Sequence, residues 1–249
     1  MALDPDIRRV LVALSGIEGE WAHLDAALDL AERLRAELTA LFVEDVNLLR
    51  ASRLSCVREV GRASAQSRQL EFANVERGLK IAAVEAESRL RQGAEPRVLR
   101  YSFQVMRGRP VSRLLDLAER LDAVLLAPPA WERRRPAASR PIALVYDASA
   151  EAERALALAA GLARGTGSPL HLLMPAAGDA VYRQCLALAR EQVAGLALSG
   201  ERIAPDTVLA DRINRLDAGL LVLHAASGFN AAMLDRLRNR LRCDLLLLR

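Results

Sequence analysis

Lysine, aromatic residues and cysteine are all scarce in this chain of 249 residues. Lys80 is the only lysine, so arginine supplies nearly all of the positive charge, and aromatic residues make up 4% of the sequence. Nucleic-acid binding needs clustered cations, and binding of single strands also needs aromatic platforms for the bases. Because the formal net charge is only +4 and acidic residues are interspersed almost everywhere, we expect no nucleic-acid partner.

Long apolar runs and paired cysteines are missing as well. Cys56, Cys185 and Cys243 are odd in number and show no C-x-x-C spacing, which argues against a disulfide framework. No apolar run approaches the roughly eighteen residues of a membrane-spanning helix, and residues 1–9 are too polar for a signal peptide. We therefore expect a cytoplasmic protein without membrane insertion.

Catalytic and metal-binding signatures are also missing from the sequence. It contains no G-x-S-x-G elbow, no HExxH sequence and no Walker A loop. The three histidines, His23, His171 and His224, are isolated from one another, and the cysteines are not clustered, so no metal site is expected. The sequence thus predicts a protein that is not an enzyme and has no catalytic residues.

The hydrophobic pattern near the start is typical of a β-α-β unit. Residues 10–14 are a short apolar run bounded by charge and by Ser15 and Gly16, which predicts a strand buried on both faces of a parallel sheet. Apolar residues then recur at helical spacing over residues 21–34, and residues 38–43 read as the next strand. Alternating strands and helices predict a doubly wound α/β sheet.

The same unit returns later in the chain. Residues 142–146 are an apolar run, and a turn, an Ala/Leu-rich helix ending near residues 165–167 and a second strand at 170–174 follow. A second block repeats too, since the letters RLDA precede an apolar run at residues 120–123 and again at residues 215–218. Two matched blocks in the same order indicate an internal duplication.

The two predicted copies are unequal. The first copy carries extra residues between its second and third strands, within 46–95. We expect a loop or short helices over 46–72, a helix over 73–92 that stops at Gly93, and strands at 98–106 and 124–127, with a turn at 108–110 leading into a helix between them. A charged stretch then leaves no room for a final helix and strand.

The second copy keeps these last two elements, with a helix expected from about 230 to 241 and a strand at 244–248. The predicted organisation is a first domain over residues 1–130, a linker over 131–140 and a second domain over 141–249.

In motif pattern the chain resembles the universal stress proteins over nearly its whole length. The matching segments are residues 10–16 and 142–149 for the first strand, 105–110 for a V-x-x-G-x-P turn, 122–127 for the fourth strand and 243–248 for the last strand. The resemblance implies two tandem Rossmann-like (adenine nucleotide alpha hydrolase-like) domains with parallel sheets. It also implies that the two copies pack as an intramolecular pseudo-dimer, with a homodimer left open.

ATP-binding universal stress proteins resemble one another in an Asp after the first strand and a G-x2-G-x9-G-[ST] loop after the fourth. The first copy has Ser15 in place of the Asp, and prolines follow its fourth strand. The second copy keeps Asp147, Ser227 and Gly228, which are its candidate cofactor-binding residues, but lacks the third glycine and its Ser/Thr. ATP is therefore expected to bind weakly or not at all.

Structural roles are open alternatives at the same positions. Asp147 can instead cap the following helix, and Ser227 or Asn230 can cap the last helix. His224, at the end of the preceding strand, either faces a pocket or is a structural histidine.

The leading expectation for function is a non-catalytic, universal-stress-type protein with a stress-response or regulatory role. One alternative is an adenine-nucleotide-binding module that uses the second domain only. Another is an interaction module that regulates a signalling or membrane partner through residues 46–72.

Overall fold

The computed structural model describes residues 7–14, 21–60, 66–108, 122–128, 139–175, 178–203, 208–224 and 227–249, to which every structural statement below refers. The strands are β1 (Arg9–Leu14), β2 (Glu37–Asp45), β3 (Arg58–Val60), β4 (Ser67–Gln69), β5 (Tyr101–Gly108), β6 (Ala123–Leu126), β7 (Ile142–Val145), β8 (Leu170–Met174), β9 (Leu198–Arg202), β10 (Leu220–His224) and β11 (Asp244–Leu248). The helices are α1 (Trp21–Leu34), α2 (Val46–Ala51), α3 (Phe72–Ala94), α5 (Ala150–Thr166), α6 (Asp179–Gln192), α7 (Leu209–Arg215) and α8 (Ala231–Arg238).

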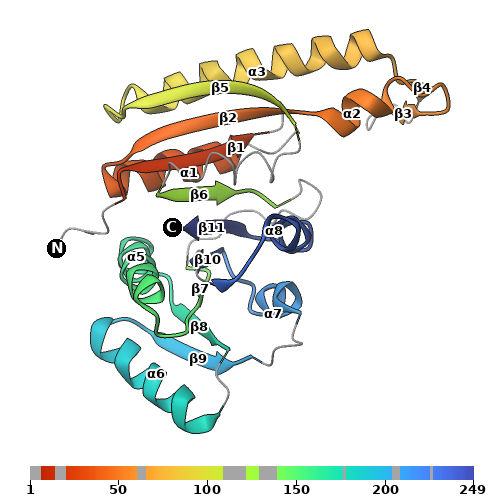
Figure 1. The fold of residues 1–249 in the computed structure, drawn as a ribbon. Coiled ribbons are helices and arrows are strands. Elements are labelled where there is room, and N and C mark those ends of the chain that lie inside the picture. The colour runs from red at the N-terminus through yellow and green to blue at the C-terminus, as the bar shows by residue number, and fades with distance from the viewer. Residues whose placement is uncertain are drawn as a thin grey trace.

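Nine of these strands form one sheet in the order β5-β2-β1-β6-β11-β10-β7-β8-β9 (Figure 1). Neighbouring strands are parallel throughout, except that β6 and β11 pair antiparallel in the middle. The strands on the β5 side therefore run opposite to those on the β9 side. The α/β class with a mostly parallel sheet is confirmed.

Strand order is the same in the two halves when it is counted along the chain. In the first half, the strands from the middle of the sheet outwards are β6, β1, β2 and β5, which are the fourth, first, second and third strands of that half along the chain. In the second half, the corresponding strands are β10, β7, β8 and β9, again the fourth, first, second and third along the chain. The second half also has a fifth strand, β11, which lies between β10 and β6. Among the described residues no strand lies between β6 and β7. The domain boundaries themselves stay a prediction.

Both faces of the sheet are buried, because successive residues of each strand point to opposite sides. In β1, Val10 and Val12 belong to a core that α1, α3, α5 and α6 cover. Leu11 belongs to a second core on the other face, to which α7 and α8 contribute. This is why β1 reads as a continuous apolar run and not as an alternating one.

The segment 46–72 is partly as we expected, since it contains a short helix, but it also contains two strands that we did not expect. It contains the short helix α2 and a two-stranded antiparallel hairpin of β3 and β4, which project from one end of the molecule (Figure 1). The hairpin is separate from the main sheet. It escaped sequence analysis because it has three-residue strands with polar composition. Helix α3 connects the second and third strands of the first half, as α6 does in the second half. The extra residues of the first half are therefore fewer than the 46–95 that we expected.

Two further expectations were wrong in detail. Helix α3 does not stop at Gly93 but continues to Ala94, and a Cβ on Gly93 would lie 2.3 Å from Cδ1 of Leu28 in α1. A larger residue at position 93 would have to displace the Leu28 side chain, so this glycine serves the packing of two helices and does not end α3. Strand β5 begins at Tyr101 instead of 98, because Val98 adopts a positive φ of 53° in a turn and is 91% exposed.

The predicted end of α5 is confirmed, because Gly167 is its C-cap with a φ of 67°. Helix α8 ends at Arg238 and not at Leu241, and Asn230 caps its start.

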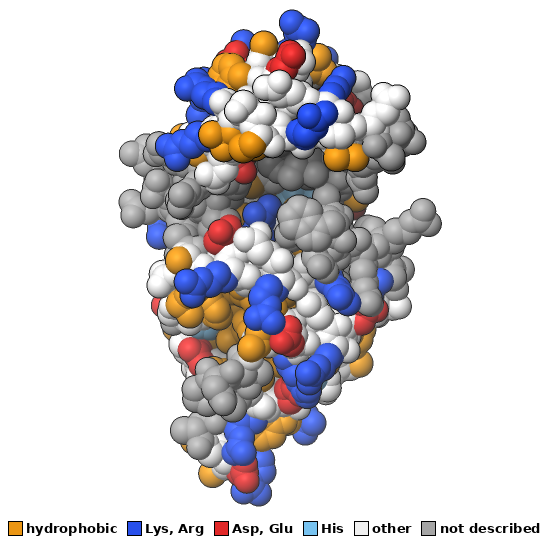
Figure 2. Space-filling model, turned by 90° about the vertical axis from the view of Figure 1, so that its right-hand side faces the viewer, with side chains coloured by type: hydrophobic (Ala, Val, Ile, Leu, Met, Phe, Trp, Pro, Cys, Tyr) orange, Lys and Arg blue, Asp and Glu red, His pale blue; other side chains and the backbone are white. Residues whose placement is uncertain are grey.

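Charged side chains are mixed over the face that α7 and α8 cover. Figure 2 shows arginines spread over this side with acidic and apolar side chains between them. None of the described helices is both long and apolar enough to cross a membrane.

Candidate functional site

The best candidate site lies where β7 and β10 end side by side. These two strands are parallel neighbours, with Ile142 opposite Leu220 and Leu144 opposite Val222. Beyond β7 the next strand in space is β8, and beyond β10 it is β11, so the order reverses between them. Ligands of doubly wound folds bind beyond the carboxyl ends of the strands at such a switch point. Asp147 follows β7 by two residues, and His224 is the last residue of β10.

Asp147 is held by the turn between β7 and α5. Its Oδ1 accepts a hydrogen bond from the backbone N–H of Ser149 at 3.0 Å. Ala148 between them has a positive φ of 61°, a conformation that non-glycine residues adopt mainly in tight turns. The N-cap of α5 is Ser149, whose hydroxyl accepts from the N–H of Ala152 at 3.1 Å. The alternative that Asp147 caps this helix was therefore wrong.

His224 is buried beside this carboxylate. Its side chain is 1% exposed, and its Nε2 lies 3.6 Å from Oδ1 of Asp147. At that distance the contact is electrostatic and longer than a hydrogen bond. Neither ring nitrogen of His224 has a hydrogen-bond partner within the part of the chain that the structure describes. The site thus holds a buried imidazole that faces one acidic side chain.

Burial and charge act in opposite directions on this pair. Burial lowers the pKa of His224, and the nearby carboxylates of Asp147 and Glu151 only partly oppose it. For Asp147, burial raises the pKa, but the hydrogen bonds from Ser149 and the charge of His224 outweigh it, so the pKa is lowered overall. At neutral pH the pair is therefore a neutral imidazole next to a carboxylate.

Ser227 and Gly228 follow β10 after residues 225–226, which lie outside the described residues. The hydroxyl of Ser227 is buried and has no hydrogen-bond partner among the described residues. Gly228 has a φ of 76°, and an added Cβ would meet nothing within 4 Å. Glycine there is explained by backbone conformation alone. The helix cap is Asn230, whose Oδ1 accepts from the N–H of Met233 at 3.0 Å, so Ser227 is not the cap.

The corresponding switch point of the first half lies between β1 and β6. Ser15 and residues 129–130 fall outside the described residues, so that end is seen only through Leu14, Ala127 and Pro128. The carbonyl oxygen of Ala127 accepts a hydrogen bond from Nε of Arg238 at 2.8 Å. Arg238 belongs to α8 in the other half. The chain that leaves β6 is thus bound to the second half of the molecule.

Each histidine faces a carboxylate from a distant segment, which the sequence did not reveal. His23 Nδ1 lies 3.2 Å from Asp244, and His171 Nε2 lies 3.6 Å from Glu201. His171 Nδ1 also lies 2.8 Å from the hydroxyl of Ser199. The partners are far apart in sequence, and only the sheet brings them together. The described residues contain no group of three or more His, Cys, Asp or Glu that could hold a metal ion.

Glu201 is fixed on its other side by Arg212, which binds both of its carboxylate oxygens. Hydrogen bonding to Arg212 lowers the pKa of Glu201. Burial lowers the pKa of His171, against the attraction of Glu201. Glu201 thus links His171 on β8 to Arg212 on α7 at this edge of the sheet.

Comparisons with solved structures show which known fold the chain shares. Neither the protein-family models nor the curated proteins gave a match to this chain. Among solved structures, a universal stress protein from Archaeoglobus fulgidus DSM 4304 is similar, with 14% identity and a TM-score of 0.58 over 97% of this chain and 96% of that one.

A second solved structure, a protein of unknown function from Pseudomonas aeruginosa PAO1, is 16% identical with a TM-score of 0.58, over 97% of this chain and 92% of that one. Both similarities extend over nearly the entire length of each chain, as the motif resemblance did. In its architecture, the chain has the α/β fold of the universal stress proteins.

Proposed function

We propose that the protein is a non-catalytic, universal-stress-type protein with a stress-response or regulatory role, and that it binds adenine nucleotides weakly or not at all. The observation that carries this proposal is the state of the second switch point. The carboxylate of Asp147 accepts a hydrogen bond from Ser149, and its Oδ1 lies 3.6 Å from Nε2 of the buried His224. Phosphate binding needs several converging backbone N–H groups, which glycine-rich loops provide. Gly228 is the one glycine of the expected motif that this chain keeps.

The proposal includes an internal pseudo-dimer in the cytoplasm. The antiparallel pairing of β6 with β11 joins the two halves across residues 123–126 and 245–248, which supports a pseudo-dimer because it covers the edge strand of each half. Cys56, Cys185 and Cys243 are unpaired, which is consistent with a reducing compartment.

A second candidate is a small-ligand or nucleotide site that uses the second half only. It is favoured by the buried polar atoms without hydrogen-bond partners, which are both ring nitrogens of His224 and the hydroxyl of Ser227. An unsatisfied buried polar group costs about 1–3 kcal/mol, so a ligand that satisfied it would bind with that advantage. Both residues flank the strand end next to Asp147.

Thermal unfolding with ATP, ADP and AMP separates these two candidates. A ligand at a hundred times its dissociation constant stabilises the folded state by about 2.7 kcal/mol. The leading proposal predicts no clear shift of Tm at millimolar nucleotide. A large shift that Asp147→Ala abolishes would replace it with the second candidate. Asp25→Ala, an exposed substitution on α1, is the matched control and should behave as the unmodified protein.

A third candidate is an interaction module at the hairpin end. Leu48 is 41% exposed, Leu54 is 54% exposed and Val60 is 62% exposed around α2 and β3. The end of the molecule that carries the hairpin shows apolar and arginine side chains on its surface (Figure 2). Leu54→Ser with Val60→Ser should then reduce capture of a partner in pull-down experiments. An unchanged set of captured proteins would exclude this candidate.

A further inference from the structure

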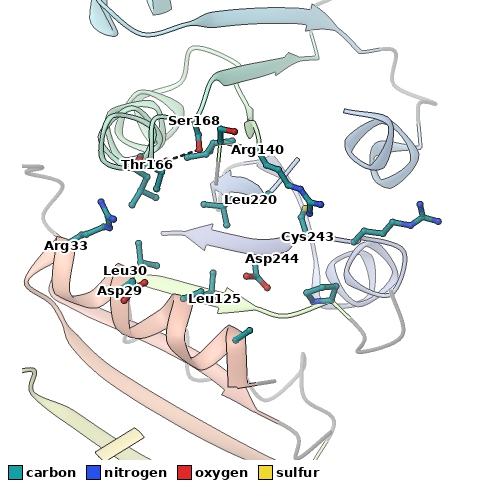
Figure 3. Close-up of a pocket in the computed structure, with 18 residues that line it drawn as sticks. Asp29, Leu30, Arg33, Leu125, Arg140, Thr166, Ser168, Leu220, Cys243 and Asp244 are labelled. Atoms are coloured by element: carbon teal, nitrogen blue, oxygen red, sulfur yellow. Dashed lines mark hydrogen bonds between the residues drawn. The ribbon is translucent and has the colours of Figure 1, made fainter. Parts of the chain in front are cut away.

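A cavity of about 340 Å³ lies between the two halves, bounded by α1 and α5 (Figure 3). Its floor is the sheet surface at β6, β7, β10 and β11, and its walls are the facing sides of the two helices. The lining residues that matter below are Ala26, Leu30, Arg33, Leu125, Leu162 and Leu220. The volume is near the lower end of the roughly 300–1,000 Å³ that small-molecule sites occupy, and such sites are frequent at domain interfaces.

The cavity is distinct from the switch point described above. Ile142 and Leu220, which are the first residues of β7 and β10, line it. Asp147 and His224 lie at the opposite ends of the same strands. The two places are therefore separated by the length of the strands, and a ligand in one does not touch the other.

The deep part of the cavity is apolar and the rim is charged. Leu30, Leu125 and Leu162 are at most 6% exposed and form its buried surface. Asp29 and Arg33 on α1 lie at the rim, with Arg140 on the far side (Figure 3). A ligand that fills this space needs an apolar body and one polar end.

The charged side chains of the lining other than Arg33 already have protein partners. Asp29 binds Arg97 at 2.9 Å, and Asp244 faces the buried ring of His23 at 3.2 Å. Arg140 is paired as well, with Asp217 at 3.5 Å. A cationic ligand would have to displace one of these partners.

Arg33 differs from these residues. It has no hydrogen bond or ion pair with any residue in the described part of the chain, although it stands at the mouth of the cavity. Its guanidinium rests against the backbone of α5, since a Cβ on Gly165 would lie 2.1 Å from Nη1 of Arg33. A guanidinium offers a planar set of donors that matches a carboxylate. Among the described arginines that line the cavity, Arg33 is thus the one without a protein partner, and it stands above an apolar floor.

We propose that this inter-half cavity binds a small organic monoanion, namely a carboxylate with an apolar body, whose acidic group is held by Arg33. The apolar body lies on Leu125, Leu162 and Leu220. This site goes beyond the proposed function and does not depend on it. Both halves contribute to the cavity, so occupancy would stabilise their association.

Three probes with one tail and different head groups test the charge requirement. The reporter is 8-anilinonaphthalene-1-sulfonate, an apolar anion that fluoresces when it enters an apolar site, and the competitors are decanoate, decanol and decylammonium. We expect one reporter to bind per chain and decanoate to bind about tenfold more tightly than decanol. A tenfold difference corresponds to about 1.4 kcal/mol, which the charge-assisted hydrogen bond to Arg33 supplies. Decylammonium should displace it least.

Two variants and a control locate the binding. Arg33→Gln should reduce decanoate to the affinity of decanol, and Ala26→Phe should abolish displacement by filling the cavity. Arg164→Gln, an exposed arginine on α5 outside the lining, should leave all three affinities unchanged. Gly165→Ala keeps every charge but forces the Arg33 guanidinium to move. It should therefore weaken the binding of decanoate and leave the binding of decanol and decylammonium unchanged. This variant replaces Ala26→Phe if that variant does not fold.

The proposal is overturned if decylammonium binds as well as decanoate, or if no competitor displaces the reporter. It is also overturned if Arg33→Gln and Arg164→Gln weaken decanoate equally. Circular dichroism spectra and the Tm of each variant should be measured to check that the variants compared are folded.

Discussion

The two halves of this sheet end differently at their switch points. In the first half, the carbonyl of Ala127 after β6 is bound by Arg238 from the other half, and Pro128 has no N–H to offer a ligand. In the second half, Asp147 and His224 face each other at the ends of β7 and β10. The strands beneath are equally apolar in both. The fold is therefore retained by buried strands, whereas ligand binding depends on the few residues that follow them.

The largest effect is expected where the halves meet. Leu246 in β11 is fully buried and pairs with Leu125 in β6, so Leu246→Asp places a charge in the centre of the sheet. An unpaired buried charge is among the most destabilising changes known. We expect loss of cooperative folding in denaturant titration. Ile81→Asp, on the exposed side of α3, should change the unfolding free energy by no more than about 0.5 kcal/mol. Independent unfolding of two intact halves would contradict the single-sheet account.

The next effect concerns the first half. Arg238→Ala removes the hydrogen bond to the Ala127 carbonyl, and a hydrogen bond to a charged donor contributes about 1.5–3 kcal/mol. Because the contact is only partly buried, we expect a loss near 1.5 kcal/mol in urea unfolding. Arg236→Ala on the exposed side of the same helix is the control. If the two variants lose the same stability, the contact does not hold the end of β6.

Acidification should act through the second half, at its switch point and at its β8–β9 edge. Burial lowers the pKa of His224 and of His171 below the ordinary 6.5. A histidine whose pKa is lowered in the folded protein binds a proton more readily in the unfolded protein. The folded state therefore has its full stability above about pH 6.5 and loses stability as the pH falls below that value. His224→Gln should flatten the loss of Tm between about pH 7 and pH 5. An unchanged slope would show that His224 is not the titrating group.

Asp147 acts in a lower pH range and with the same sign. Its pKa is lowered from 3.8, so the folded state favours the carboxylate and loses that stability only as pH falls below about 4. Asp147→Asn should therefore flatten the loss of Tm below about pH 4. It should also steepen the loss between pH 7 and pH 5, because the Asp147 carboxylate partly opposes the lowering of the His224 pKa.

The smallest effect is expected at Ser227. Its hydroxyl is buried without a partner among the described residues, so Ser227→Ala removes a polar group that gains nothing from burial. We expect the unfolding free energy to stay the same or rise by up to about 1 kcal/mol. Ser149→Ala, which removes the cap of α5, should instead lose about 1 kcal/mol. Destabilisation by Ser227→Ala would mean that a bound group satisfies the hydroxyl.

The central strands could be predicted from the sequence, whereas the edge strand β9 and the reason for Gly93 could not. Strands such as β1 and β11 are buried on both faces, so they appear as uninterrupted apolar runs. Strand β9 has the sequence LSGER with one large apolar residue, because it lies at the edge and packs on one side only. Gly93 was misread as a helix end because the side chain that packs against it, Leu28, belongs to another helix.

The site was predictable only in part. Asp147 could be placed at a strand end by its motif, and the structure puts it at the reversal of strand order. Its contact with His224, and the inter-half cavity at Arg33, depend on segments that are distant in sequence. Hydrophobic periodicity gives elements but no distances between them, so these pairings needed the three-dimensional structure.

The most direct test of the account is a calorimetric titration of the intact protein with ATP, alongside Asp147→Ala. The account holds that the second switch point keeps its sheet position and Asp147 but lacks a phosphate loop. It predicts no measurable heat of binding, or a dissociation constant of about 1 mM or weaker, which corresponds to about −4 kcal/mol. A micromolar dissociation constant that Asp147→Ala abolishes would contradict it.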